Sequence, residues 1–324
     1  MRSNLDVDGS GVRVRVPAKV NLFLAVRGLR GDGYHELVTV LQTVSLYDEV
    51  RAGFTGPPGR GHHPAARRRM SVELRTNGQQ GLPAAAENLA VRAALALGRR
   101  TGFADLEAPA EPDAPRTVLE LHKRIPVAGG MAGGSADAAG ALVALNQLWR
   151  TELDRDALRA VAAELGSDVP FCVQGGTALA TGRGTALAQV LCRGTFTWVV
   201  GTAREPLATA EVYRAWDRNC RPGDADPQAV LTALRSGDPA ALGPALHNDL
   251  EQAAFALRPE LAEAKTALLE AGALGAVLSG SGPTLLGLCA DDAAAEDVAD
   301  KVRDGYRDVL TARSPAGGPD TAAG

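Results

Sequence analysis

The chain has 324 residues, 45% of them hydrophobic, and a formal net charge of −4 at pH 7. This length and apolar content suit one large or two moderate globular domains and exclude a chain that is disordered throughout. The slightly negative charge, with basic residues spread along the chain, argues against a general nucleic-acid binder and favours a small or nucleotide-sized partner.

The cysteines and the hydrophobic runs indicate the cellular compartment of the protein. Its four cysteines lie far apart with no C-x-x-C pair, and its five histidines show no zinc spacing, so reduced thiols and no zinc site are expected. The first residues, MRSNLDVDGSG, are polar, and no apolar run approaches membrane-spanning length. We therefore expect a cytoplasmic protein without a membrane or nucleic-acid partner.

Strand patterns open the chain. Residues 12–16 alternate valine with arginine, which predicts a half-buried strand, and Pro17 interrupts it before a second extended run over 18–26. Residues 37–46 are largely β-branched and apolar and predict a further strand. The stretch 53–69, GFTGPPGRGHHPAARRR, is rich in Gly, Pro and Arg and predicts a surface insertion or loose loop.

The middle of the chain predicts a helix, a strand, a glycine loop and a second helix. Residues 88–100 carry a helical pattern, residues 107–115 form a proline-broken loop, and residues 117–123 suit a strand that leads into the glycines. Farther on, apolar residues over 158–165 recur at steps of three and four, as on one side of a helix.

The second half of the chain mixes both kinds of element. We expect strands over 173–180, 196–200, 276–278 and 284–289, and mainly helices over 206–220 and 239–271. The segment after Arg313, SPAGGPDTAAG, is expected to be frayed. Because strands and helices do not alternate regularly, the order indicates an α+β protein with helices grouped on sheets.

Residues 125–145, IPVAGGMAGGSADAAGALVAL, place four glycines within six positions at the entrance of an alanine-rich helix. Ser135 suits the N-cap, and Asp137 would lie in the first turn. Free N–H groups there, with glycines that let a ligand approach the main chain, make a site suited to phosphate. Tight packing of the helix on a sheet is the alternative explanation of the glycines.

The spacing of these glycines excludes two familiar phosphate-binding loops. There is no G-x-G-x-x-G, and although residues 129–134 have P-loop spacing, Ser135 stands where that motif requires lysine. A P-loop NTPase is therefore disfavoured. Ser135 is either a cap alone or also a ligand of a magnesium ion or a phosphate.

Phosphoryl transfer also needs positive charge and a base for the acceptor hydroxyl, and both must come from elsewhere in the chain. In PAKVNLFL, Lys19 and Asn21 are two residues apart, so a strand directs both to one face, either a cleft or a solvated surface. Asp168, in LGSDVPF, is either an N-cap or, beside a lysine, a carboxylate that orients or deprotonates a substrate hydroxyl. The SGSGP segment at 279–283 either closes against the first glycine cluster as further backbone donors or is a simple hairpin turn.

Three of these segments together resemble the three ordered motifs of the GHMP small-molecule kinases: PAKVNL at 17–22, PVAGGMAGGS at 126–135 and SGSGPT at 279–284. Within that superfamily, DGYHE at 32–36, LGSDVPF at 165–171 and NDLE at 248–251 are similar to the kinases that act on 4-diphosphocytidyl-2-C-methyl-D-erythritol in non-mevalonate isoprenoid synthesis. The resemblance runs from about Val12 to Leu310, without the 53–69 insertion and the tail.

The resemblance implies an α+β, two-domain GHMP kinase fold with ATP-binding and substrate-binding domains. We place an N-terminal GHMP kinase domain at 1–172, a C-terminal one at 173–313 and a disordered tail at 314–324. ATP and Mg²⁺ are the implied cofactors, and the implied partner is a small-molecule substrate with a cytidyl diphosphate group. The implied reaction, carried out by a monomer or weak homodimer, moves the γ-phosphate of ATP to the 2-hydroxyl of the methylerythritol unit.

The resemblance also assigns residues. Lys19 and Asp168 match the family's catalytic pair, and Ser135 would hold the metal. The positions that match contacts to ATP are Pro126, Val127, Ala128, Gly129, Gly130, Met131, Ala132, Gly133, Gly134, Ser135 and Ala136. The positions that match the acceptor site are Asn21, Tyr34, His35, Asp168, Thr209 and Tyr213. Tyr213 matches an aromatic that stacks on cytosine, a contact worth about 1–3 kcal/mol per base, and an ordinary buried tyrosine is the alternative.

The sequence departs from the family pattern in two ways. Met131 and Ala132 replace the usual Leu-Gly, which narrows the backbone freedom of the loop, and no second carboxylate for magnesium is evident. Another kinase of the superfamily, acting on homoserine or mevalonate, would keep the glycine loops but need no base-stacking pair. A nucleotide-binding module without turnover would be expected to lack Lys19 or Asp168, and both are present.

Overall fold

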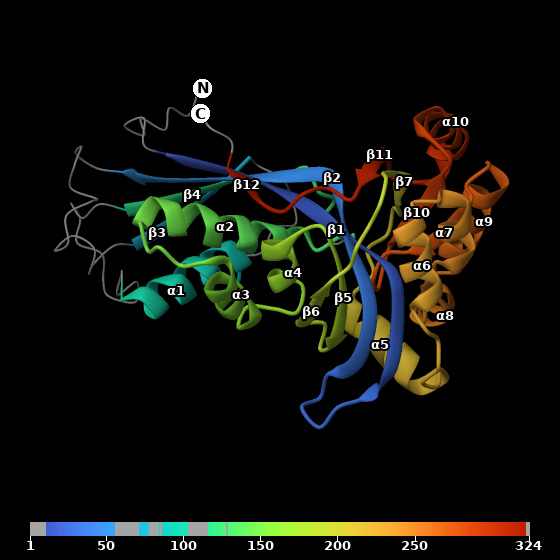
Figure 1. Cartoon of the computed structure of the whole chain (residues 1–324), viewed down its shortest axis with the longest axis horizontal. Coiled ribbons are helices and arrows are strands. Elements are labelled where there is room, and N and C mark those ends of the chain that lie inside the picture. The colour runs from blue at the N-terminus through green and yellow to red at the C-terminus, as the bar shows by residue number, and fades with distance from the viewer. Residues whose placement is uncertain are drawn as a thin grey trace.

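The computed structural model describes residues 11–55, 71–77, 84, 86–102, 116–127 and 129–321. Most of the 53–69 insertion, the 107–115 loop, Ala128 and residues 322–324 lie outside the described residues. The described residues form a pair of sheets that stand side by side, each with its own helices (Figure 1).

The first sheet is built on two long antiparallel strands, β1 (Val12–Leu29) and β2 (His35–Thr55). Its hydrogen-bonded order is β12-β1-β2-β4-β3, with β5 beside β2, β6 beside β5 and β8 beside β1. The other strands are β3 Ser71–Thr76, β4 Arg116–His122, β5 Thr177–Gly182, β6 Ala186–Gln189, β8 His247–Asn248 and β12 Asp320–Thr321. With α1 (Leu89–Thr101), α2 (Gly133–Trp149), α3 (Arg155–Ala163) and α4 (Val169–Gln174), this sheet forms what we call the first lobe.

Within the described residues, the second sheet has four antiparallel strands in the order β11-β7-β10-β9. They are β7 Phe196–Thr202, β9 Gly275–Leu278, β10 Thr284–Cys289 and β11 Asp308–Ser314. The helices of this second lobe are α5 Thr209–Asn219, α6 Gln228–Ser236, α7 Pro239–Leu242, α8 Glu251–Leu257, α9 Glu260–Glu270 and α10 Asp292–Val302, with 3-10 turns η2 Gly243–Ala245 and η3 Arg303–Gly305.

The alternation at the start of β1 confirms the predicted half-buried strand, because the valines of 12–16 are buried and the arginines are exposed. The predicted break at Pro17 is wrong. The strand continues, and only its register with β2 shifts between Pro17 and Ala18. A proline cannot donate to the ladder, and a bulge of this kind absorbs the missing bond without ending the strand.

The hydrophobic core runs through both lobes. Along β7, Trp198 and Val200 belong to the larger core cluster together with Trp149 of α2, whereas Val199 belongs to a second cluster with residues of α8, α9 and α10. Successive side chains of a strand point to opposite faces, so the second sheet is buried on both sides. One face of it shares its core with the first lobe, which holds the two lobes together.

The structure divides the chain at a different place from the predicted domain boundary. The strand expected from residue 173 begins only at Thr177, because α4 continues to Gln174 and the next two residues are glycines with positive φ. β5 and β6 join the first sheet, so a boundary after Cys172 does not match the sheets. The chain passes to the second sheet between Gln189 and Phe196.

The tail expected to be frayed is held on the first lobe up to Thr321. The Ser314 hydroxyl donates to Gln42 Oε1 of β2 at 2.6 Å, and the Ala316 N–H donates to Thr43 O at 3.0 Å. β12 then pairs with β1. The glycines and prolines of this segment suggested fraying because its partners are far away in the sequence, where a local pattern cannot show them.

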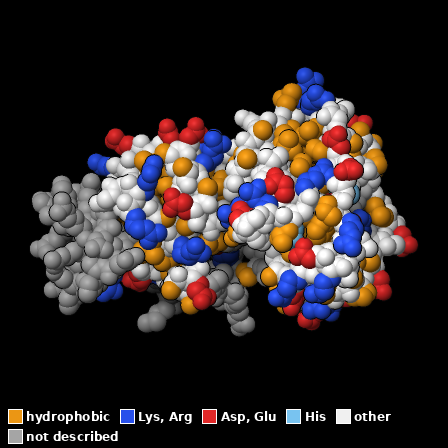
Figure 2. Space-filling view, turned by 90° about the horizontal axis from the view of Figure 1, so that it is seen from below, with side chains coloured by type: hydrophobic (Ala, Val, Ile, Leu, Met, Phe, Trp, Pro, Cys, Tyr) orange, Lys and Arg blue, Asp and Glu red, His pale blue; other side chains and the backbone are white. Residues whose placement is uncertain are grey.

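The exposed charges on one face of the molecule are mixed in sign (Figure 2). On the face that Figure 2 shows, Lys and Arg side chains are interspersed with Asp and Glu over both lobes. Such mixing produces no extended field of one sign on this face. Among the described residues, none of the helices combines the length and the hydropathy that a membrane crossing needs.

Gly140 allows α2 to pack closely on the first sheet, which predicts a stability effect. A Cβ at this position would lie 2.6 Å from Val16 Cγ2 and 2.7 Å from Val50 Cγ2. We expect Gly140→Ala to lower the free energy of unfolding by about 1–3 kcal/mol, measured by chemical denaturation, because both valines are fixed in buried strands.

Gly134→Ala in the same helix is the matched control for Gly140→Ala, because the nearest atom to its new Cβ would be Leu89 Cδ1 at 3.6 Å. This control should keep wild-type stability or gain a little, since alanine favours a helix over glycine. Wild-type stability of Gly140→Ala would contradict the close packing of α2.

Candidate active site

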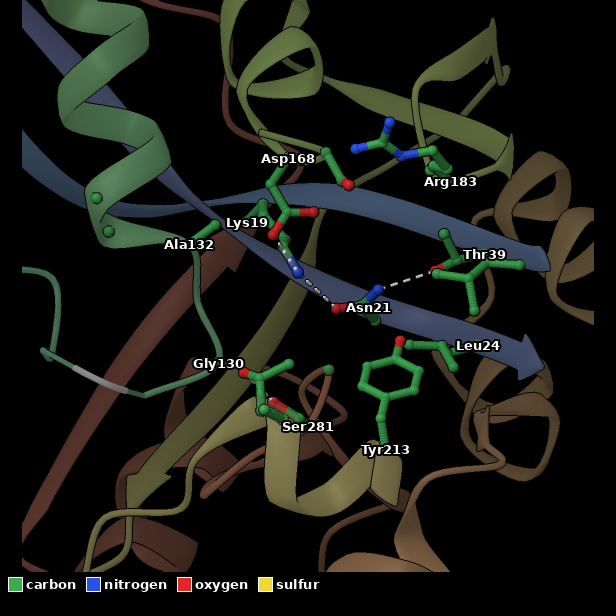
Figure 3. A pocket seen from close by; sticks show the side chains of 18 of the residues that line it. Lys19, Asn21, Leu24, Thr39, Gly130, Ala132, Asp168, Arg183, Tyr213 and Ser281 are labelled. Carbon is green, nitrogen blue, oxygen red and sulfur yellow. Dashed lines mark hydrogen bonds and ion pairs between the residues drawn. The ribbon is translucent and has the colours of Figure 1, made fainter. Parts of the chain in front are cut away.

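A cavity of about 990 Å³ lies between the two lobes. Its walls come from β1 and β2, from the glycine loop at 125–134, from α5 and from the SGSGP loop at 279–283 (Figure 3). This volume is at the upper end of the range for small-molecule sites. Segments that are far apart in the sequence therefore converge on one site.

Lys19, Asn21 and Asp168 form one connected polar group in this cavity. The Lys19 ammonium donates to Asn21 Oδ1 at 2.9 Å and lies 3.3 Å from Asp168 Oδ2. Asn21 Nδ2 donates in turn to Thr39 Oγ1 at 2.9 Å (Figure 3). Because Lys19 is 5% exposed and Asn21 3% exposed, the solvated strand face is wrong and the predicted cleft is confirmed.

Asp168 does not cap the helix that follows it. It occupies the N-cap position of α4 with αR backbone angles, and its side chain makes no capping bond. Its carboxylate, with 37% of the side chain exposed, faces Lys19 and the cavity instead. A carboxylate held by an ammonium on one side and open on the other can accept a hydrogen bond from a bound hydroxyl.

The glycine loop enters α2 differently from the prediction. The helix starts at Gly133, and its N-cap is Ala132, with φ 56° and ψ 34° and no side-chain capping bond. Ser135 lies half-buried in the first turn, so the prediction that it caps the helix is wrong. The first N–H groups of a helix have no acceptor within it and remain available to an anion.

The SGSGP loop is the turn of the β9–β10 hairpin, and it also lies against the glycine loop, so neither alternative given for this segment excludes the other. Gly130 has φ +72°, and a Cβ there would overlap the carbonyl oxygen of Ser279 and lie 2.9 Å from that of Gly282. Ser279 Oγ donates to Gly130 O at 3.2 Å. Behind the SGSGP loop, Asn248 Nδ2 donates to Gly280 O at 2.7 Å. Glycine at position 130 is thus required by close approach as well as by φ.

The β1–β2 hairpin lies beside α5 (Figure 1). Aromatic side chains gather where the two meet. The His35 ring stacks on the Tyr213 ring with centroids 4.7 Å apart and meets Trp216 edge-on at 5.7 Å. His35 Nε2 lies 2.7 Å from Asp217 Oδ1. Burial, reinforced by the charge of Asp168, raises the pKa of Tyr213, so its phenol stays protonated near neutral pH.

The cavity brings together the residues predicted to bind the acceptor: Asn21, Tyr34, His35, Asp168, Thr209 and Tyr213. Thr209 Oγ1 lies 2.8 Å from Ser281 Oγ and so joins α5 to the SGSGP loop. The loop residues that line the cavity are Pro126, Val127, Gly129, Gly130, Ala132, Gly133 and Gly134. The structure places Met131 and Ala136 in the core instead, and Ser135 is not among the lining residues.

A second buried charged group, which the sequence patterns did not reveal, lies beside the glycine loop. Lys123 Nζ donates to Asp137 Oδ2 at 2.7 Å and also to Asp48. All three side chains are buried, and Asp137 Oδ1 has no hydrogen-bond partner among the described residues. Burial raises the pKa of Asp137 to about 7. Lys123 follows the buried Leu119 and Leu121 at steps of two residues. This alternation along β4 could have predicted from the sequence that the Lys123 side chain faces inward.

These charged side chains fasten both ends of the glycine loop. At its start, Asp48 Oδ1 accepts hydrogen bonds from the N–H groups of Arg124 and Ile125 at 2.6 and 2.9 Å. Where the loop enters α2, Lys123 Nζ donates to Gly133 O at 3.3 Å. The two ends of the loop therefore meet at one buried ammonium group.

The raised pKa of Asp137 predicts a pH dependence of stability. Since 3.8 is the ordinary value and about 7 the folded-state value, the folded chain binds this proton more tightly, and stability falls as pH rises between the two. The slope is at most about 1.4 kcal/mol per pH unit for one group.

We expect Asp137→Asn to remove this slope. Its free energy of unfolding should therefore gain on that of the wild type between about pH 5 and pH 7, and the difference should then level off above about pH 8. Chemical denaturation at several pH values measures both proteins. A difference that does not change with pH would contradict the raised pKa.

Family models match both lobes. The model for the GHMP kinases N terminal domain matches residues 88–176, and the model for the GHMP kinases C terminal matches residues 230–308. The first match contains the glycine loop and Asp168, and the second contains the SGSGP loop.

Curated relatives are similar to nearly the whole chain. The 4-diphosphocytidyl-2-C-methyl-D-erythritol kinase of Nocardia farcinica (strain IFM 10152) is 47% identical over 320 residues, which cover 97% of this chain and 97% of the relative. The kinase of the same name from Mycobacterium tuberculosis (strain ATCC 25618 / H37Rv) is 47% identical over 300 residues, covering 91% of this chain and 87% of the relative.

Solved structures share the fold. The crystal structure of a 4-(cytidine 5'-diphospho)-2C-methyl-D-erythritol kinase matches with a TM-score of 0.72 at 35% identity and covers 94% of this chain and 100% of that chain. A homoserine kinase from Cytophaga hutchinsonii matches in fold at 18% identity, with a TM-score of 0.70 and 99% of each chain covered. The predicted α+β GHMP kinase fold is thus confirmed, and the chain belongs to the 4-diphosphocytidyl-2-C-methyl-D-erythritol kinase family of the GHMP kinases.

Proposed function

We propose that this protein transfers the γ-phosphate of ATP to the 2-hydroxyl of 4-diphosphocytidyl-2-C-methyl-D-erythritol, a step of isoprenoid precursor synthesis by the methylerythritol phosphate pathway. The observation that carries the proposal is the Lys19–Asp168 pair, 3.3 Å apart, in one cavity with the glycine loop and the His35–Tyr213 stack. The family to which the chain belongs supports the same acceptor.

The glycine loop is proposed to hold the phosphates of ATP. Gly129, Gly130, Gly133 and Gly134 line the cavity, and the start of α2 offers main-chain N–H groups and the positive end of the helix dipole. Such a site binds phosphate without the lysine of a P-loop, which this chain lacks.

Magnesium is proposed to bind with the ATP phosphates near Ser135. Among the described residues, no three His, Cys, Asp or Glu side chains gather in a way that holds a metal ion. The hydroxyl of Ser135, in the first turn of α2, fits an ion that takes its other ligands from phosphate and water. Asp137 is directed to Lys123 instead. When bound, the ion would neutralise charge on the phosphates.

The acceptor is proposed to lie with its cytosine at the aromatic end of the cavity. Tyr213 offers a ring to a flat base, and Asn21, His35 and Thr209 offer polar groups near it. Its reacting hydroxyl then meets the open side of the Asp168 carboxylate, which orients it and takes its proton as the new O–P bond forms and the bond from the γ-phosphorus to the bridging oxygen breaks, releasing ADP. Lys19 holds that carboxylate in place and stabilises charge on the transferred phosphoryl group.

A kinase of homoserine or mevalonate is the competing function, since proteins with those names share the fold. Neither acceptor contains a base to stack, so the stacked His35 and Tyr213 favour the cytidyl acceptor. A module that binds ATP without turnover would need neither Lys19 nor Asp168. Their pairing in the cavity favours catalysis.

Release of ADP by the purified protein tests the proposed function. With ATP and magnesium, we expect turnover with 4-diphosphocytidyl-2-C-methyl-D-erythritol and none with homoserine or mevalonate. Asp168→Asn should lower kcat by roughly 10²- to 10⁴-fold while ATP still binds, because the amide cannot take the proton. Asp224→Asn, an exposed carboxylate outside the cavity, is the matched control and should keep wild-type activity.

The other outcomes each identify a different error. Turnover with homoserine or mevalonate alone would leave the kinase fold standing and reject the cytidyl acceptor. ATP binding without turnover on any of the three acceptors would favour the non-catalytic module. Full activity of Asp168→Asn would remove that carboxylate from the mechanism.

A further inference from the structure

Arg183 is a cationic residue of the cavity that the described residues do not neutralise. It lies in the turn between β5 and β6 and lines the cavity. Of the other cationic residues that line the cavity, Lys19 and Lys123 pair with carboxylates, and Arg214 is exposed on α5. Within the described ranges, by contrast, no carboxylate forms an ion pair with Arg183, and its buried Nε has no hydrogen-bond partner. A guanidinium group that has an unpaired donor and no carboxylate partner indicates an anionic ligand.

The guanidinium group of Arg183 is held in a fixed plane. Its central carbon lies 3.7 Å from the centroid of the Tyr34 ring. Stacking of this kind uses the face of the guanidinium group and leaves the N–H donors at its edge free. Asp32 feels the charge of Arg183 but is already hydrogen-bonded to Arg30 and to the Tyr34 N–H.

The turn that carries Arg183 lies between the two ends of the cavity. A Cβ on Gly184 would lie 3.9 Å from Ser167 Cβ, next to Asp168, so this turn borders the reacting end. On its other side Arg183 covers Tyr34, at the aromatic end. Figure 3 shows the guanidinium group on the side of the cavity where Asp168 lies, across from Tyr213.

We propose that Arg183 binds the diphosphate group of the acceptor and makes the enzyme select acceptors that carry one. This inference rests on the proposed function, in which the reacting hydroxyl meets Asp168 and the cytosine meets Tyr213. The covalent order of that acceptor is base, ribose, diphosphate and alcohol, so its diphosphate lies between the two ends, where Arg183 stands. A planar guanidinium group donates two parallel N–H bonds to phosphate oxygens.

The γ-phosphate of ATP is the other anion that would come near Asp168. The glycine loop and Lys19 already supply donors and charge for it. Arg183 also contacts Tyr34, which is next to His35 in the sequence, so its charge lies between the reacting end and the aromatic end (Figure 3), and this favours the acceptor diphosphate. Substitution of Arg183 should raise the KM for the acceptor if Arg183 binds the acceptor diphosphate, and the KM for ATP if it binds the γ-phosphate.

Steady-state kinetics of the full chain with ATP, magnesium and 4-diphosphocytidyl-2-C-methyl-D-erythritol tests the inference. We expect Arg183→Gln to raise the KM for the acceptor by roughly 10- to 100-fold, while the KM for ATP and kcat stay within about twofold. Arg183→Lys should raise the KM for the acceptor less, because lysine keeps the positive charge, although it lacks the two parallel N–H donors of arginine. Arg193→Gln, an exposed arginine outside the cavity, is the control and should match the wild type.

Binding of cytidine 5′-diphosphate and of cytidine gives a second readout that needs no turnover. The wild type should prefer the diphosphate, and Arg183→Gln should lose most of that preference. An unchanged preference, or a rise in the KM for ATP alone, would overturn the role of Arg183. A wild type that neither turns over the acceptor nor binds cytidine 5′-diphosphate would reject the proposed function, and this inference with it. Wild-type thermal unfolding midpoints for the variants exclude misfolding as the cause.

Discussion

The main-chain contact between Gly130 and the SGSGP loop is the constraint on which the site depends. It joins a loop of the first lobe to a loop of the second at a distance that leaves no room for a Cβ. The same glycine loop is tied to β1, because the Lys19 N–H donates to Met131 O at 3.2 Å. Loop, lysine and SGSGP segment therefore form one unit, and movement of any of them would displace the Lys19 ammonium group.

The two lysines of the cavity are held by carboxylates, whereas Arg183 has no such partner among the described residues. Lys19 is paired with Asp168, and Lys123 is enclosed between two carboxylates at the base of the glycine loop. The anchored loop presents its main chain in a fixed shape, which would lower the reorganisation needed for the proposed binding of phosphate. The left-handed conformation of Ala132, costly by roughly 1–2 kcal/mol for a residue with a Cβ, persists because the loop is fixed at both ends.

Local patterns predicted most of the described elements, since they depend on neighbours within one or two turns. The strands near 117–123, 196–200 and 284–289 and the helix near 88–100 lie within a few residues of their predicted positions. The predictions were wrong where contacts with residues far away in the sequence determine the local structure. The tail after Ser314 is ordered by its contacts with Thr43 and β1. The N-cap of α2 is Ala132 and not Ser135, because contacts with other parts of the fold fix the glycine loop.

The sequence by itself determined the chemistry that the site can use. Alternation along a strand placed Lys19 and Asn21 on one face, and the motif spacings indicated the kinase family. Only the tertiary structure decided which groups meet. It brings Asp168 to Lys19, His35 to Tyr213 and Gly130 to Ser279, and it buries Lys123 between carboxylates. Such contacts depend on how two sheets and their helices pack, and packing joins residues whose separation along the chain carries no local signal.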